Sequence, residues 1–285
     1  MIKKIAFELK KNIHSMVNKF GIDIVKSSEN FLDEKWLSPM ELVYRTHNRH
    51  ILLRVPVDKV RFLGVHGYKV NQKGTAPFIS TLEKYKDNKI KGYKDSTLCE
   101  FYSKFQPKTI SEYLYLQNTS NNLMNSLPPS GVFLPWQNVD PIEQVNQRAI
   151  QVESDNQEHK ANISFSGGDP FYGPVSIEKA NLEYNRLTKV FDSIQKHGFK
   201  VDTKGKDNIN AIVLEHGNEY RYFIISGQHR IAALSVLGYE KIALQIYKGL
   251  IVRRSEVGFW PGVTNGYFKS SEALAVFDRI FVGLD

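Results

Sequence analysis

The chain has 285 residues, of which 41% are hydrophobic and 24% charged, and its formal net charge is +8. This composition is typical of an ordinary globular protein with one large or two modest domains. The single cysteine, Cys99, excludes an intrachain disulfide framework and a cysteine-based zinc site. No apolar run reaches the roughly 18 residues of a membrane span. We therefore expect a cytoplasmic protein without an integral membrane segment.

The positive charge favours anionic partners such as nucleotides, sugar phosphates, nucleic acid or a lipid surface. It is scattered along the chain and does not form a block of like charges, so it can equally serve to keep the protein soluble.

Residues 1–117 are predicted to form a mixed, mostly helical region. Residues 2–20 have apolar side chains at steps of three and four, which predicts an amphipathic helix that packs on the protein or lies on an acidic membrane. Residues 51–55 and 60–65 are strand-like, and residues 80–116 read as helices. Tyrosines beside lysines in that helical part belong to the core or stack on nucleic-acid bases.

Residues 118–160 are rich in Asn, Ser, Pro and other polar residues, which predicts a loop-rich linker. Residues 161–285 form the predicted second unit. A Gly/Pro-rich loop at 165–174 precedes a helix whose apolar stripe runs from Ala180 to Ile194, and residues 210–215 read as a strand. The tail contains a loop and a last helix around residues 274–281.

The most informative stretch is residues 221–247, RYFIISGQHRIAALSVLGYEKIALQIY. Tyr222 to Ile225 predicts a strand buried on both faces, and an Ala-rich helix follows the Ser226-Gly227 turn. Gly238 stands where a helix needs a left-handed residue after its end, and Tyr239 to Tyr247 predicts another strand. A strand, a glycine turn and a helix N-terminus with basic side chains favour an anion site, most simply for phosphate.

The order of features in SGQHRIAALSVLGY resembles the ParB/sulfiredoxin superfamily, in which a strand, a Gly-x-(His or Arg)-Arg turn, a short Ala-rich helix and a Leu-Gly-aromatic turn follow one another. The resemblance covers about residues 173–247. It implies an α+β fold with a small mixed sheet and packed helices, to which residues 1–117 add a largely helical N-terminal region or an insertion.

Within that superfamily, Gln228 stands where sulfiredoxins have their catalytic cysteine, so sulfiredoxin chemistry is not expected. ParB proteins of chromosome partitioning have an acidic residue and a second arginine in this turn, and a helix-turn-helix directly after the core, which is not evident here. The turn is more similar to the His-rich turn of the free serine kinases.

The resemblance and the turn chemistry together give the candidate nucleotide- or phosphate-binding residues. They are Ser226, Gly227, Gln228, His229 and Arg230. Arg230 is expected to pair with a phosphate bidentately, the alternative being a structural salt bridge under the turn. His229 could bind phosphate as a cation, move a proton near neutral pH, or be a structural histidine.

Further candidates lie outside the turn. Glu183 is the candidate catalytic base by resemblance to the kinases, with Arg186 three residues later on the same helix as a substrate contact or a surface ion-pair partner. Asp169 is the candidate Mg²⁺ ligand or hydroxyl-orienting group, or a turn-forming Asp before a proline. Trp260 and Asn265 belong to a long loop that could close over a substrate.

We therefore expect a nucleotide-dependent phosphotransferase that uses ATP, ADP or CTP with Mg²⁺ and acts on a small hydroxyl compound such as an amino acid or a sugar. The alternative is a ParB-like nucleotide switch, or a protein that binds or cleaves nucleic acid. The sequence lacks a P-loop, a G-x-G-x-x-G motif and an H-E-x-x-H motif, so those three chemistries are not expected.

Overall fold

The fold was analysed in a computed structural model that describes residues 31–33, 41, 51–72, 74–117, 119–201 and 208–284. The amphipathic helix predicted for residues 2–20 lies outside this range. In the part that is described, no helix is long and apolar enough to span a membrane.

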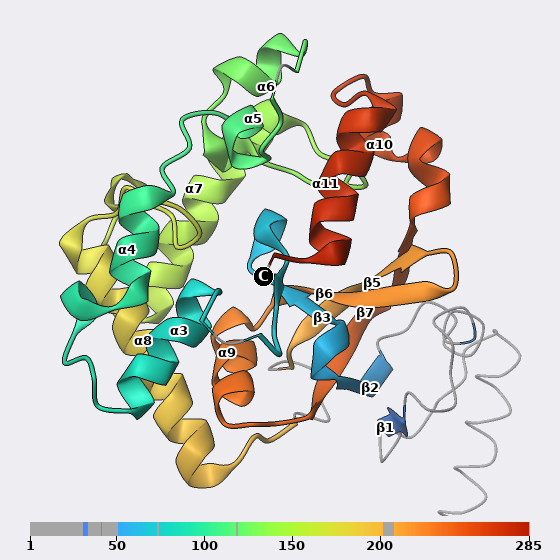
Figure 1. The fold of residues 1–285 in the computed structure, drawn as a ribbon. Coiled ribbons are helices and arrows are strands. Elements are labelled where there is room, and N and C mark those ends of the chain that lie inside the picture. The colour runs from blue at the N-terminus through green and yellow to red at the C-terminus, as the bar shows by residue number, and fades with distance from the viewer. Residues whose placement is uncertain are drawn as a thin grey trace, which may run out of the picture.

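The described chain is a mixed α+β structure built on one curled sheet (Figure 1). Its strands are β1 (Phe31–Asp33), β2 (Ile51–Pro56), β3 (Val60–Phe62), β4 (Tyr68–Lys69), β5 (Asn210–His216), β6 (Glu219–Ser226) and β7 (Lys241–Arg253). They lie in the order β1-β2-β7-β5-β6-β3-β4. The pairs β1–β2, β7–β5 and β6–β3 are parallel, and the other pairs are antiparallel.

Successive strand residues point to opposite sides of the sheet, and at the centre of the sheet both sets are buried. In β5, Ala211 and Val213 join the core on one face, whereas Ile212 and Leu214 join a second core on the other. The predicted strand 222–225 is confirmed as the end of β6, but Ile225 is 44% exposed, where the sheet reaches a cavity.

The first core lies under four helices: α3 (Pro77–Lys86), α4 (Thr97–Lys104), α8 (Ile177–His197) and α9 (Gln228–Val236). The predicted stripe of the long helix is confirmed in α8, where Ala180, Tyr184, Leu187, Phe191 and Ile194 are buried. Ser176 caps the start of α8 by accepting from the Lys179 backbone N–H, and Gly198 follows its end at φ +73°.

The second core lies on the opposite face of the sheet. Its helices are α5 (Ile110–Tyr113), α6 (Asn122–Ser126), α10 (Pro261–Thr264) and α11 (Ser270–Val282). The predicted C-terminal helix is confirmed as α11, whose Val276, Phe277 and Ile280 are fully buried. In Figure 1, α10 and α11, drawn in red, lie at the upper right of the view, and α3, α8 and α9 lie at the lower left.

Short 3₁₀ turns complete the chain. They are η2 (Val57–Lys59), η3 (Gly64–His66), η4 (Tyr93–Asp95), η5 (Pro129–Gly131), η6 (Phe165–Gly167) and η7 (Arg254–Phe259).

The predicted loop-rich linker contains an 18-residue helix, α7 (Pro141–Glu158). Asp140 caps it by accepting from the Ile142 and Glu143 backbone N–H groups, and Pro141 occupies the first turn, as is common at a helix start. Only Pro141, Val152 and Asn156 are buried in α7. The helix therefore has no continuous apolar stripe, and the periodicity of the sequence did not reveal it.

The sheet combines the strands at 51–62 with those at 210–253, although more than 140 residues separate them. The first core includes buried residues from both sides of the predicted linker, such as Phe62, Leu98, Phe191 and Ile224. Within the described ranges, residues 118–160 therefore do not separate two cores.

Candidate functional site

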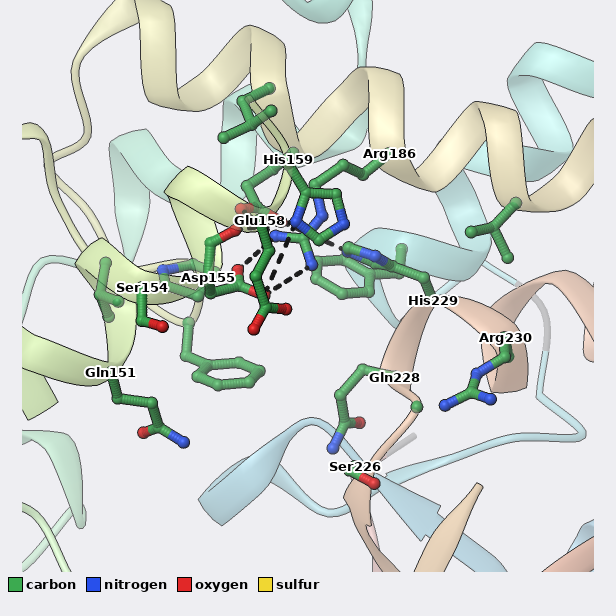
Figure 2. Close-up of a pocket in the computed structure, with 18 of the residues that line it drawn as sticks. Gln151, Ser154, Asp155, Glu158, His159, Arg186, Ser226, Gln228, His229 and Arg230 are labelled. Carbon is green, nitrogen blue, oxygen red and sulfur yellow. Dashed lines mark hydrogen bonds and ion pairs between the residues drawn. The ribbon is translucent and has the colours of Figure 1, made fainter. Parts of the chain in front are cut away.

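A cavity of about 1070 Å³ lies between α7, α8 and the junction of β6 with α9 (Figure 2). Its wall combines polar and charged side chains with apolar ones, among them Phe78, Phe171 and Ile225. The predicted residues Ser226, Gly227, Gln228, His229, Arg230, Glu183 and Arg186 all line it.

The β6–α9 junction exists because Gly227 adopts a left-handed backbone at φ +91°. A Cβ there would lie 3.2 Å from Ile209 Cα and 3.2 Å from Arg230 Nη2, tighter than ordinary contact. Gly227 is also the N-cap of α9, and no side chain caps the helix. The first amide groups of this nine-residue helix therefore start at the cavity wall with the positive end of the helix dipole.

Side chains around Gly227 hold the junction in place. Gln228 accepts from the Leu63 backbone N–H at 2.9 Å and donates to the Ile224 carbonyl at 3.1 Å. Ser226 Oγ accepts from Asn210 Nδ2 at 2.9 Å. The Gln228 side chain thus has a structural role. The group of Gln228 that remains for a ligand is its backbone N–H.

Arg230 lies two residues after Gln228 in α9, and it lines the cavity. Its Nη2 donates to the backbone carbonyl of Asn208 at 3.3 Å. This bond helps to fix the guanidinium at the cavity wall.

Glu183 is 1% exposed and lies at the centre of a network of charged side chains. Its Oε1 accepts from Lys179 Nζ at 2.7 Å and from Arg186 Nη1 at 3.0 Å, and its Oε2 lies 3.4 Å from His229 Nε2. Burial alone would raise the pKa of this carboxyl group. The hydrogen bond and charge of His229, with Arg186 and Lys179, outweigh burial and hold the Glu183 pKa well below its usual range.

Two residues of α7 extend this network. Asn156 Oδ1 accepts from Lys179 Nζ at 2.6 Å, and both groups are fully buried. The Asp155 carboxylate accepts from Arg186 Nη1 at 2.5 Å and from Nη2 at 3.1 Å. Burial opposes the charge of Arg186, but Glu183 and Asp155 together raise the pKa of its guanidinium.

His229 connects the charged network to the helix N-terminus. Its ring packs against Phe78 at a centroid distance of 5.1 Å, and its side chain is 15% exposed. With Nε2 directed at Glu183, Nδ1 is the ring atom left to face another partner.

Asp169, the predicted metal ligand, is bound by other groups of the protein. Arg148 binds it bidentately, with Nε–Oδ2 at 2.6 Å and Nη2–Oδ1 at 2.9 Å. Its Oδ1 also accepts from the Phe171 backbone N–H at 2.9 Å, which is the turn-forming arrangement expected of an Asp before a proline. Asp169 is 2% exposed and is not among the residues that line the cavity. In the described ranges, no group of three or more His, Cys, Asp or Glu is arranged to hold a metal ion.

Trp260 and Asn265 lie away from the cavity. Trp260 is buried in the second core, 5.6 Å from the Trp136 ring and 5.5 Å from the Phe277 ring. Asn265 ends the short helix α10. The structure therefore does not bring these two predicted substrate residues to the site, because they belong to the opposite face of the sheet.

Sequence reasoning missed the contribution of α7, which supplies Arg148, Asp155 and Asn156. It also missed Lys179, although its spacing from Glu183 is the i, i+4 spacing of a helical ion pair. The signal for α7 was the Asp-Pro pair at 140–141, a common helix start. Comparisons with protein-family models, curated proteins and solved structures gave no match to this chain.

Proposed function

We propose that the chain is a nucleotide-dependent phosphotransferase that acts on a small hydroxyl compound such as an amino acid or a sugar. The observation that carries the proposal is the N-terminus of α9, which no side chain caps and which opens into a large cavity beside Arg230 and His229. Phosphoryl transfer needs positioned amides and cations around the phosphates and a base near the attacking oxygen.

In this proposal the phosphates of ATP, ADP or CTP bind at the start of α9. Backbone N–H groups of residues 228–230 point at the phosphate, and the helix dipole favours its charge. Arg230 adds charge-assisted hydrogen bonds. Mg²⁺ would enter with the nucleotide, since phosphate oxygens and waters supply most ligands of this ion at such sites.

We assign the proton-accepting role to His229 instead of Glu183. Glu183 is buried, bonded to three cationic or potentially cationic groups, and a weak base because its pKa is depressed. It therefore serves better to orient the His229 ring and to balance the charge that the ring acquires. The acceptor hydroxyl oxygen attacks the terminal phosphorus, its proton passes to His229 Nδ1, and the bond to the bridging oxygen of the nucleotide breaks.

The first test is nucleotide binding. A thermal-shift screen of ATP, ADP, CTP and GTP with Mg²⁺ identifies the ligand, because a ligand that binds only the folded state raises the melting temperature. We then expect Arg230→Ala to weaken binding of that nucleotide at least about tenfold in calorimetry, the effect of removing a hydrogen bond to a charged group.

The matched control is Arg254→Ala, which removes an arginine paired with Asp278 on another part of the surface. It should leave nucleotide affinity unchanged. Equal affinities of the wild type and Arg230→Ala would contradict the assignment of the phosphate site.

The net charge of +8 also favours the second candidate, a ParB-like nucleotide switch or nucleic-acid-binding protein. Salt separates the two. Binding to duplex DNA falls steeply with added salt, because each neutralised phosphate releases counterions. A small-molecule kinase should show little binding to duplex DNA at about 150 mM salt, where the Debye length is roughly 8 Å.

A further inference from the structure

The Arg186 guanidinium is bound from α7 in the way that an arginine binds an oxyanion ligand. Two of its nitrogens donate to the two oxygens of the Asp155 carboxylate, at 2.5 and 3.1 Å. Planar, bidentate pairing of this kind is the usual mode of carboxylate and phosphate recognition by arginine. Both residues line the cavity (Figure 2).

Arg186 has a second carboxylate partner besides Asp155. Its Nη1 also donates to Glu183 at 3.0 Å, and Glu183 is held in turn by the fully buried Lys179. The Arg186 side chain is 18% exposed, whereas that of Asp155 is 38% exposed. The arginine is therefore preorganised from behind, and the carboxylate in front of it is in contact with solvent.

Asp155 supplies one of the two carboxylates that pair with Arg186. Lys179 and Arg186 carry two positive charges, and Glu183 and Asp155 carry two negative ones. When Asp155 withdraws, one positive charge faces the cavity. That charge lies close to the α9 N-terminus, since Glu183 joins Arg186 to His229 through the two oxygens of one carboxylate.

Helix α7 is suited to such a withdrawal. Only three of its 18 residues are buried, and polar pairs connect it to α8 and to the loop before α8. Asp155 lies in its last turns, where breaking one half-exposed ion pair disturbs little packing.

We propose that Asp155 is a built-in competitor of the ligand: it occupies Arg186 in the unliganded protein, and an oxyanion of the bound ligand displaces it. The oxyanion is a phosphate of the nucleotide or a carboxylate of the acceptor. This inference rests on the proposed function, because it assumes that an anionic ligand enters this cavity. It adds that ligand entry releases α7 from Arg186, so that the contact regulates affinity.

The test compares Asp155→Asn with Glu158→Gln by calorimetry, at about 150 mM salt and without Mg²⁺. Glu158 lines the same wall of the cavity, and within the described part of the chain its side chain has no hydrogen bond or ion pair, so its variant removes the same charge without freeing Arg186. ADP and glycerate serve as separate probes for a phosphate and a carboxylate.

We expect Asp155→Asn to bind one of the probes about fivefold more tightly than the wild type, the factor that corresponds to losing a half-exposed ion pair. Glu158→Gln should gain no more than about twofold, as expected for a distant charge in water. The gain should disappear in Asp155→Asn/Arg186→Gln, because the freed guanidinium is then absent. The probe that shows the gain identifies the displacing group.

Equal gains in Asp155→Asn and Glu158→Gln, or weaker binding by Asp155→Asn, would overturn the competitor role and leave the proposed function standing. If the wild type and all variants bind neither ADP nor glycerate, and the nucleotide screen with Mg²⁺ is also negative, both the proposed function and this inference are wrong.

Discussion

At the scale of single residues, the charged side chains of Lys179 and Glu183 are buried, and a buried charge lowers stability unless it is paired. A buried ion pair such as Lys179–Glu183 adds little net stability compared with apolar residues of similar size, yet removing one partner strands the other charge. Asn156 satisfies Lys179 from a second helix, and His229 faces the second oxygen of Glu183. These contacts fix the position of the carboxylate that His229 faces.

His66 is a buried histidine with a different environment. It is 2% exposed, stacks on Tyr68 at 5.2 Å and meets the Phe105 ring edge-on at 4.5 Å. Its Nδ1 lies 3.2 Å from the Tyr115 hydroxyl, and its Nε2 is buried without a hydrogen-bond partner in the described structure. Burial, and then the charge of Arg279, lowers the pKa of His66 from 6.5 to about 3.

This depressed pKa predicts a loss of stability in mild acid. Below pH 6.5 the unfolded chain takes up a proton at His66 that the folded chain refuses until about pH 3, so the free energy of unfolding falls as the pH falls through this window. From about pH 6.5 to about pH 5 the loss is about 2 kcal/mol. His66→Phe keeps the aromatic packing and should lose less stability over the same range, measured by urea denaturation at both pH values.

The same experiment has a clear negative outcome. If the wild type and His66→Phe lose equal stability over this pH range, His66 is not the group that links folding to protons. Near neutral pH the variant should be about as stable as the wild type, since it loses the contact of Nδ1 with the Tyr115 hydroxyl but also removes a buried nitrogen, Nε2, that has no partner in the described structure.

At the scale of elements, α9 has a glycine with a left-handed backbone at each end, and their surroundings differ. Gly227 has φ +91° and close neighbours, whereas Gly238 has φ +82° and no atom within 4 Å of the position that a Cβ would take. Both would strain on substitution by alanine.

We expect Gly238→Ala to cost about 1 kcal/mol of stability, from backbone strain alone, and to leave nucleotide binding unchanged. Gly227→Ala should cost more and should also weaken binding, because the new Cβ pushes against Ile209 and Arg230 and moves the first turn of α9. Urea denaturation and calorimetry on both variants give the comparison. Equal effects of the two substitutions on binding would show that the position of this turn is not critical.

The elements also show how far the sequence predicts the structure. The strand, glycine turn and helix at 222–236 were predictable because each has a strong local signal in continuous sequence. The helix α7 was not, because it is held by a cap at its start and by polar pairs with residues elsewhere in the chain more than by an apolar stripe. The cavity wall was predicted at the β6–α9 junction and missed at α7, which contacts Lys179 and Arg186 only through tertiary structure.

At the scale of the whole molecule, one sheet serves two cores. The helices α3, α4, α8 and α9 cover one face, and α11 with its neighbours covers the other. The strands at 51–62 join strands far along the chain, since β2 pairs with β7 and β3 pairs with β6.

Because the cores share strands, we expect them to unfold together. Phe277→Ala removes a fully buried ring that contacts Trp136, Trp260 and Phe281, and should cost about 3–5 kcal/mol. The loss should shift the urea midpoints of tryptophan fluorescence and circular dichroism equally. Val282→Ala, at a side chain 64% exposed, should change stability by less than about 0.5 kcal/mol. Two separated transitions in the Phe277 variant would show that the cores are independent.

The two sides of the cavity, the β6–α9 junction and helix α7, are attached to the fold in different ways. This has a consequence for how the sequence can change in evolution. The β6–α9 side follows an interior strand, so a substitution there disturbs the whole sheet. The facing helix is attached mainly by polar pairs, and substitutions on it should be tolerated. We expect related chains to keep the first side and to diversify the second, and in this way to accept new molecules on an old scaffold.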